Sequence, residues 1–484
     1  AGAAAALFQL IRTYTHQLTA PAPFVSPPPP RPCQQQLVDD HVMFKDMAAD
    51  PYLASAGIAS DWPCGRGCYQ SADGGFIIWF GEEDQLRIMC MAKGFVLNEV
   101  FDRLETALKA VEAIEGIEFA TSSKYGYVTS CPSNLGTGMR ASVHVKVPNL
   151  TKDGTDKQAK AAAKPLGLSV RGTGGEHTPI GADGTIDLSP SNRLFITEGE
   201  IVTKLYKGIK LLLEKEAAAG GGAVEPAEEK SEEVADTSAK LAEIKASAEA
   251  AIAANPDNLC AKNLLDAEVA AWMATLSPSK LDELALCAKS GLDNVDSGLG
   301  CYAVDPKNYD EFAMFFDKVC EDYHHGGGKV HTTNWSLEGV EGLPEDGKLD
   351  LQKIGLTDQL SMRVRVGRNL TAFPLPGLMT KADRINFEKR MLLAFDALKA
   401  NPAYGGSVFS MTPNADWTEV TGDEANPNLI TQKKYQVSAG AAAALFQLIR
   451  TYTHQLTAPA PFVSPPPPRP CQQQLVDDHV MFKD

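Results

Sequence analysis

The stretch CPSNLGTG, residues 131–138, is the segment from which the rest of the chain is best interpreted. It sets a cysteine before a proline and continues with small and amide residues. The apolar stretch YGYVTS (125–130) leads into it, and MRASVHVKVP (139–148) leads out. A cysteine in this setting is either a buried structural thiol at the end of a strand or a reactive group held beside a substrate.

The bulk composition is that of an ordinary soluble protein. The chain has 484 residues, of which 44% are hydrophobic and 22% charged, and this length suits about two to four domains. Its formal charge of −16 argues against general nucleic-acid binding but leaves room for a local basic pocket. No apolar run approaches the roughly 20 residues of a membrane span. The first 46 residues lack a signal-peptide pattern, and the 10 cysteines lack paired metal spacing, so we expect reduced thiols.

The chain repeats its own beginning. Residues 1–46 recur letter for letter as residues 439–484, which chance cannot produce. Two interpretations fit this repeat: a window cut from a tandem array, or a circular permutant with a redundant end.

Hydrophobic periodicity divides the chain into two kinds of segment. Residues 47–218 alternate strand and helix signals, with strands expected at 74–80, 85–92 and 141–147 and helices at 99–114 and 201–216. In the first of these helices, Val100, Leu104, Leu108 and Val111 share one face.

The second half of the chain begins with a change of composition. Residues 219–240 are rich in Ala, Gly and acidic residues without an apolar period, which predicts a flexible linker. Residues 241–335 predict a small all-helical domain, with helices at 241–254, 261–276 and 309–323. Residues 341–484 predict a strand at 360–370, a helix at 381–400 and a proline-rich surface insertion at about 412–469.

Five arginines lie in strand-like or Gly-flanked settings: Arg87, Arg140, Arg171, Arg363 and Arg365. An arginine inside an apolar strand needs a carboxylate or a phosphate, because an unpaired buried charge is costly. A salt bridge is the ordinary explanation for each one alone. Five are more than a core usually holds, and guanidinium groups suit phosphate oxygens.

Several motifs together resemble those of the phosphagen (ATP:guanidino) kinases, and of arginine kinases in particular: CPSNLGT, WPCGRG, EEDQLRI, RASVHVKVP, VRGTGGEHT, LVDDHVMFKD, MRVRVGR and LDNVDSGLGCYAVD. The resemblance covers roughly residues 34–215 and 280–412. It implies an α+β fold, with a small all-helical domain and a larger catalytic domain whose mainly antiparallel sheet is flanked by helices. The second half of the catalytic domain (47–218) then precedes the first half (341–484), as the repeat explains.

Enzymes of this family move a phosphoryl group reversibly between MgATP and a guanidino compound, so the resemblance implies Mg²⁺ with ATP or ADP as cofactor. It places Glu82 and Asp84 on the Mg²⁺ through water. It assigns ATP binding to Arg87, Arg140, Arg171, Arg363, Arg365, Ser361, His41, its copy His479, and His144.

The same resemblance also implies which residues bind the guanidino compound that accepts the phosphoryl group. Glu83 is expected to orient the guanidinium and take its proton, with Glu176 as a second carboxylate. Cys131 is expected to face the guanidinium as a thiolate whose pKa nearby positive groups lower. Together these three are the expected catalytic residues. The substrate's amino-acid end is expected at Ser297, Gly298, Leu299 and Tyr302, and this loop and Glu176 favour L-arginine.

Two positions depart from the arginine-kinase pattern. Gly174 stands where arginine kinases usually carry another arginine. The segment MFKDMAADPYL (43–53) lacks the arginine expected to bind Asp296 across the domains.

The leading hypothesis is therefore an arginine-kinase-like transferase within a multi-unit polypeptide. The alternative is a scaffold, an array of kinase-like units in a larger assembly such as a cilium, with weak or no activity. The expected partners are ATP, L-arginine, neighbouring kinase units and a ciliary or cytoskeletal assembly, without nucleic acid or a membrane span. The expected location is the cytoplasm and, by association, a cilium or flagellum. Whether one chain closes a complete site or neighbours share one stays open.

Overall fold

The computed structural model describes residues 34–173, 179–218, 239–326 and 328–430. Most of the predicted linker, both proline-rich stretches, Glu176 and His479 lie outside the described residues.

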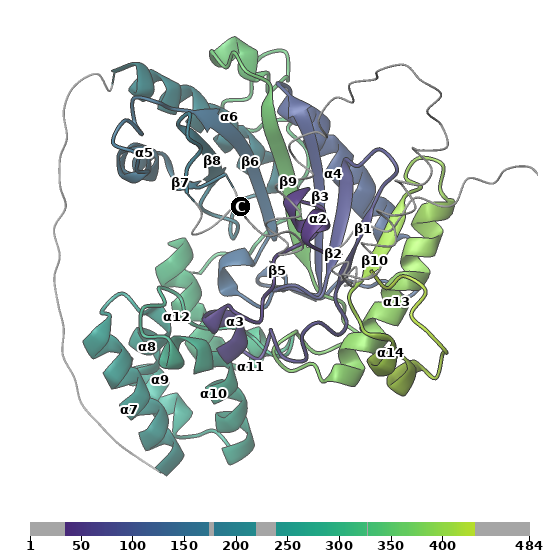
Figure 1. The fold of residues 1–484 in the computed structure, drawn as a ribbon. Coiled ribbons are helices and arrows are strands. Elements are labelled where there is room, and N and C mark those ends of the chain that lie inside the picture. The colour runs from purple at the N-terminus through teal and green to yellow at the C-terminus, as the bar shows by residue number, and fades with distance from the viewer. Residues whose placement is uncertain (1–33, 174–178, 219–238, 327, 431–484) are drawn as a thin grey trace, which may run out of the picture. The chain divides into compact units, whose positions relative to one another are not determined.

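One antiparallel sheet of eight strands organises the larger part of the molecule (Figure 1). Its strand order is β10-β1-β2-β3-β9-β6-β8-β7, and every neighbouring pair is antiparallel. The strands are β1 (Gly67–Gln70), β2 (Phe76–Phe80), β3 (Leu86–Gly94), β6 (Met139–Lys146), β7 (Leu168–Arg171), β8 (Thr185–Pro190), β9 (Leu360–Arg368) and β10 (Ser407–Ser410). The expected α+β fold with a mainly antiparallel sheet is confirmed. Strand β9, from late in the sequence, lies between β3 and β6, so the described residues of one chain form the whole sheet.

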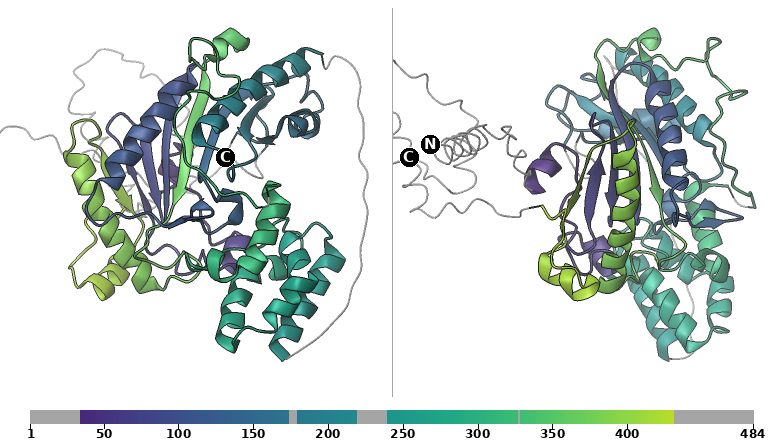
Figure 2. Two further views of the ribbon diagram at one scale, coloured as in Figure 1. Left: turned by 180° about the vertical axis from the view of Figure 1, so that it is seen from behind. Right: turned by 90° about the vertical axis from the view of Figure 1, so that its right-hand side faces the viewer.

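Side-chain alternation gives the sheet an apolar face and a polar face. On β9, Met362, Val364 and Val366 are buried in the main hydrophobic core, whereas Arg363 and Arg365 alternate with them. Three long helices pack on the apolar face: α4 (Leu97–Glu112), α6 (Glu198–Ala218) and α13 (Lys381–Ala400) (Figure 2). The four residues predicted to share one face of the 99–114 helix are all buried in this core.

A second, smaller core lies on the opposite face of the β1–β3 strands. It is formed by residues 37–59, which include the short helices α2 (Gln34–Asp39) and α3 (Pro51–Ser55). The Trp79 indole donates a 2.8 Å hydrogen bond to the Val42 carbonyl, and its ring centroid lies 5.6 Å from that of Phe44. This packing holds the segment before residue 60 against the sheet.

The helical part contains α7 (Ala239–Ala254), α8 (Leu259–Leu264), α9 (Ala267–Met273), α10 (Pro278–Asp293), α11 (Asn308–Glu311) and α12 (Ala313–His324). Two predicted helices are each broken in two. The 261–276 helix is interrupted because the Asp266 side chain accepts hydrogen bonds from Glu268 and Val269 and caps a new helix. The 309–323 helix is interrupted at Phe312, whose backbone is not helical. None of the described helices is long and apolar enough to cross a membrane.

Residues 412–430, the first part of the predicted insertion, pack against the folded domain. They contain α14 (Asn414–Thr421), Trp417 is 2% exposed, and the Ile430 amide donates to the Ser410 carbonyl at 2.8 Å. The sequence shows no hydrophobic period for α14, because this helix buries a single side chain, that of Trp417.

The remaining elements are short: β4 (Thr121–Ser122), β5 (Gly126–Tyr127), α5 (Lys157–Ala163), and the 3₁₀ turns η1 (Pro132–Asn134), η2 (Lys164–Leu166) and η3 (Leu351–Ile354). Turn η1 contains part of the CPSNLGTG stretch and contacts the helical part, where His324 Nε2 hydrogen-bonds to the Pro132 carbonyl at 2.9 Å.

Candidate active site

The five predicted arginines lie on neighbouring strands of the sheet. Arg87 is on β3, Arg363 and Arg365 are on β9, Arg140 is on β6 and Arg171 is on β7. Arg140 is directly opposite Arg365 in the β6–β9 register, and Arg171 is opposite Asp187. All five alternate with residues of the main core and therefore share the polar face.

Arg87, Arg140 and Arg363 each have a carboxylate partner. Asp187 on β8 binds Arg140 at 2.8 Å, and its other arginine, Arg363, is 3.9 Å away. Arg87 pairs with Glu82 at 2.9 Å. No described carboxylate lies within 4.0 Å of Arg365, and burial, together with repulsion from Arg87 and the other guanidinium groups, lowers its pKa. The Arg365 guanidinium, on this face, is thus suited to bind a polyanion.

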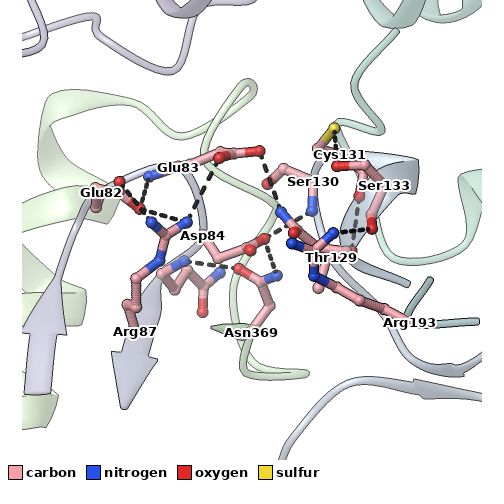
Figure 3. Close-up of polar contacts among 12 residues, drawn as sticks. Glu82, Glu83, Asp84, Arg87, Thr129, Ser130, Cys131, Ser133, Arg193 and Asn369 are labelled. Atoms are coloured by element: carbon pink, nitrogen blue, oxygen red, sulfur yellow. Dashed lines mark hydrogen bonds and ion pairs between the residues drawn. The ribbon is translucent and has the colours of Figure 1, made fainter. Parts of the chain in front are cut away.

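The carboxylate loop Glu82–Asp84 follows β2 at the edge of this face (Figure 3). Burial raises the pKa of Glu83 to about 7, an effect that Arg87 opposes and the negative charge of Glu82 reinforces. The Asn134 amide donates to Glu83 Oε1 at 3.3 Å. A carboxylate whose pKa is near neutrality can accept a proton at physiological pH and release it again.

Asp84 occupies a different environment from its neighbours. It is 0% exposed, and its Oδ1 accepts hydrogen bonds from the Ser130 amide at 2.7 Å and the Asn369 side chain at 2.8 Å. Its Oδ1 thus joins two loops, whereas its Oδ2 has no hydrogen-bond partner among the described residues. No cluster of three or more metal ligands occurs among the described residues. The Glu82 and Asp84 carboxylates are oxygen ligands of the kind that the waters of a nucleotide-bound Mg²⁺ contact.

Cys131 lies immediately before η1 and is 7% exposed. Its Sγ is 3.0 Å from the Ser133 hydroxyl. Burial raises the pKa of the thiol, and the neighbouring Glu83 carboxylate adds to the effect. The direction is opposite to the lowered pKa that was expected, because burial outweighs the hydrogen bonds of Ser133 that favour the thiolate.

Two residues near Cys131 were not found from the sequence. Arg193, after β8, is 7% exposed and donates to the Ser133 carbonyl at 3.0 Å, and its pKa responds to the charges of Cys131 and Glu83. Asn134 contacts Glu83, as described above. Both belong to stretches, SPSNRL and CPSN, in which a small polar residue precedes them, and this feature alone gives no signal of function.

The predicted nucleotide-side residues Ser361 and His144 lie on the same sheet face. Ser361 alternates with core residues on β9, two positions before Arg363, and His144 on β6 is opposite Asp187. Burial lowers the pKa of His144, and the positive charges of Arg363 and His41 act in the same direction. His41, on the segment after α2, is therefore close enough to influence His144.

The loop Ser297–Tyr302 connects the helical part to the Cys131 turn. Its carbonyls at Gly298 and Leu299 accept hydrogen bonds from the first two residues of α8, at 3.0 Å each. Directly after the loop, the Ala303 amide donates to the Ser130 carbonyl at 2.8 Å. Burial raises the pKa of Tyr302, and the charges of Cys131 and Glu83 contribute. The loop therefore lies beside the proposed acceptor position.

The site thus combines a face that carries several guanidinium groups, a carboxyl group whose pKa is about 7 and an adjacent cysteine. Comparison with protein families assigns the class directly. The ATP:guanido phosphotransferase C-terminal catalytic domain matches residues 30–219, and the N-terminal domain of the same family matches residues 255–321. The chain belongs to the ATP:guanido phosphotransferase family.

Individual relatives in this family differ in their named substrate. Arginine kinase of Anthopleura japonica is 36% identical over 387 residues, covering 78% of this chain and 48% of the relative. The testis creatine kinase of Oncorhynchus mykiss is 44% identical over 186 residues, covering 38% of this chain and 47% of the relative. The flagellar creatine kinase of Strongylocentrotus purpuratus is 34% identical over 381 residues, covering 75% of this chain and 30% of the relative. The chain thus spans about half the length, or less, of the curated relatives that it matches.

Proposed function

We propose that the chain transfers a phosphoryl group reversibly from MgATP to the guanidino group of L-arginine, as one unit of a multi-unit polypeptide. The observation that carries this proposal is the unbalanced charge around Arg365. A half-buried guanidinium without a carboxylate within 4.0 Å among the described residues, on a face shared with Arg363 and Arg140, is suited to bind an anion from outside the protein. The phosphates of ATP supply such an anion.

The arginines neutralise charge on the nucleotide while the acceptor nitrogen attacks. A bond forms between that nitrogen and the γ-phosphorus as the bond from phosphorus to the ADP oxygen breaks, and the proton of the attacking nitrogen passes to Glu83. The raised pKa of Glu83, about 7, suits a group that accepts this proton in one direction and returns it in the other. Mg²⁺ enters with the nucleotide, and Glu82 is the residue we propose to contact its waters.

Cys131 and the Ser297–Tyr302 loop are proposed to bind the acceptor. The Cys131 thiol is protonated in the empty site, and a guanidinium cation beside Sγ would favour the thiolate. Glu176, outside the described residues, is proposed as the second carboxylate. The choice of L-arginine rests on the SGLGCY loop and Glu176, and on the similarity to arginine kinase of Anthopleura japonica.

A coupled assay of ADP release with L-arginine, creatine and taurocyamine tests this function. We expect turnover with arginine to exceed turnover with the other two guanidines, and to require MgATP. Turnover confined to creatine or taurocyamine would contradict the acceptor assignment alone. Absence of turnover with every guanidine would contradict the enzymatic proposal and favour the scaffold alternative.

We further propose a cytoplasmic location near a site of high ATP consumption, with neighbouring kinase units as partners. The similarity to the flagellar creatine kinase of Strongylocentrotus purpuratus supports an association with a cilium or flagellum. Fluorescence localisation of the tagged full chain in ciliated cells tests this placement, and a signal absent from cilia would contradict the association.

A further inference from the structure

A fully buried asparagine lies immediately after β9, one residue beyond the end of the strand. Asn369 is 0% exposed. Its amide nitrogen donates to Asp84 Oδ1 at 2.8 Å and to the Val128 carbonyl at 3.1 Å, and its side-chain oxygen accepts from the Gln85 backbone amide at 2.8 Å. The Asn369 side chain therefore uses both its donor group and its acceptor oxygen, and it makes three hydrogen bonds to three different residues.

These bonds join the two loops that carry the reactive groups. Asp84 and Gln85 directly follow Glu83 in the carboxylate loop, and Val128 lies three residues before Cys131. Asp84 Oδ1 also accepts from the Ser130 amide at 2.7 Å, so a single carboxylate oxygen binds both Asn369 and the residue next to Cys131 (Figure 3). Asn369 itself continues the strand that carries Arg363 and Arg365.

We propose that Asn369 is a positioning residue that fixes the separation of the Glu83 carboxylate and the Cys131 thiol relative to the arginines of β9. This inference rests on the proposed function, because it names the reaction in which that separation matters. Only an amide of this length offers two donors and one acceptor at this point; an aspartate lacks the donors, and an alanine lacks both. Small displacements of positioned groups lower the rate of transfer strongly.

The same contacts would also arise in an asparagine that only stabilises the fold, and the chain contains a matched example. Asn426 is 5% exposed, donates to the Ser410 hydroxyl at 2.7 Å and the Thr412 carbonyl at 3.2 Å, and accepts from the Asn428 amide at 3.0 Å. Its side chain also donates to Glu388 Oε1 at 3.4 Å, so its partners belong to β10, to α13 and to the segments on either side of α14, which contribute none of the candidate site residues.

The experiment compares Asn369→Ala and Asn369→Asp with Asn426→Ala in the full chain, using two measurements. The first is the rate of alkylation of Cys131 by iodoacetamide, followed by mass spectrometry of the peptide; it does not need turnover. The second is kcat and KM for MgATP. We expect both Asn369 variants to change the alkylation rate at least about tenfold, and to lower kcat about 100-fold with KM changed less than about threefold. Asn426→Ala should leave Cys131 alkylation within about twofold of the unsubstituted chain.

The Asn369→Asp variant keeps the shape of the side chain, so it provides a result if the alanine variant does not fold. Protonation restores a donor to the introduced carboxyl group, and we therefore expect the alkylation rate of this variant to return toward that of the unsubstituted chain as the pH falls from about 7 to 5. Equal effects of Asn369→Ala and Asn426→Ala on Cys131 alkylation, or unchanged alkylation in both Asn369 variants, would overturn the proposal. An unsubstituted chain without turnover, in which the Asn369 variants still alter Cys131 alkylation, would instead contradict the proposed function and leave the coupling of the loops established.

Discussion

The hydroxyl of Tyr52 donates a 2.8 Å hydrogen bond to the Asp296 carboxylate, and this contact joins α3 to the turn after α10. The sequence has no arginine in this segment, and the structure places a tyrosine in contact with Asp296 instead. Two further bonds lie beside it: Asn294 donates to the Ser55 hydroxyl at 2.8 Å, and Ser290 to the Tyr52 carbonyl at 3.1 Å. This contact between α3 and the helical part therefore contains one formal charge rather than an ion pair.

Replacing Tyr52 by Phe tests the contribution of this tie. The ring remains while the hydrogen bond is lost, so we expect the KM for the guanidino acceptor to rise about fivefold and amide exchange at the end of α10 to accelerate. Steady-state kinetics and hydrogen-exchange mass spectrometry give the two values. Tyr69→Phe is the control, because the Tyr69 hydroxyl donates to the Gly405 carbonyl at 2.7 Å within the sheet part. Equal acceptor KM values for the two variants would show that the Tyr52 contact does not assist acceptor binding.

Replacing Glu83 by Gln removes the proposed proton acceptor and leaves the size of the side chain unchanged. We expect kcat to fall about 1,000-fold, with the dissociation constant for MgATP changed less than about threefold. Because the group must be ionised to accept a proton, kcat/KM of the unsubstituted chain should rise with pH through about 7, and the variant should lack this rise. Stopped assays from about pH 5.5 to 8.5 measure both. An unchanged rate in the variant would remove Glu83 from the mechanism.

Arg140 has a carboxylate partner and Arg365 has none within 4.0 Å among the described residues. Substituting each one should therefore distinguish an effect on nucleotide binding from an effect on the free energy of unfolding. Arg140→Met leaves the Asp187 carboxylate, 2% exposed, without its 2.8 Å partner, and we expect a loss of about 3–5 kcal/mol in the free energy of unfolding. Arg365→Met removes no such partner, so stability should change by less than about 1 kcal/mol while ADP binding weakens at least tenfold. Urea unfolding and titration calorimetry with MgADP provide the comparison. A large loss of stability in Arg365→Met would indicate a structural role for this guanidinium.

Glu388 should make stability depend on pH. It is 0% exposed, it accepts hydrogen bonds from the Ser410 and Thr412 hydroxyls, and burial raises its pKa to about 7. A carboxyl whose pKa is higher in the folded state contributes stability below its unfolded pKa and loses it as the pH rises toward 7. The free energy of unfolding of Glu388→Gln relative to the unsubstituted chain should therefore increase from about pH 5 to 8, by at most about 3 kcal/mol. A difference that is constant across this range would contradict the raised pKa.

The sequence predicted those elements whose periodicity persists over several turns or residues. The helix expected at 381–400 has the same bounds as α13, and the alternation around Arg363 and Arg365 placed both on one face. The break at Asp266 was missed because apolar residues continue through it, and only the side-chain bonds of Asp266 reveal a new helix. Hydrophobic periodicity alone does not detect a helix N-cap that lies inside an otherwise continuous helical pattern.

The site was predicted less completely than the fold, because burial depends on tertiary packing. Arg66 is as buried as any arginine of the polar face, yet it donates to the carbonyls of Ile58 and Cys64 at 2.7 Å each and stabilises a loop. The strand alternation around Arg365 distinguishes it from Arg66 in the sequence, but only the structure shows that backbone carbonyls accept from Arg66. Likewise, the sequence predicted a lowered pKa for Cys131, whereas burial raises the pKa of this thiol.

The central position of β9 affects how this chain is synthesised. Its neighbours β3 and β6 leave the ribosome first, and the entire helical part is translated before residue 360 appears. Strands β3 and β6 therefore cannot pair with the β9 of this chain until residues 360–368 have been translated. An edge strand presents unpaired backbone groups, so this order makes the pairing of β9 a late step of folding within the chain.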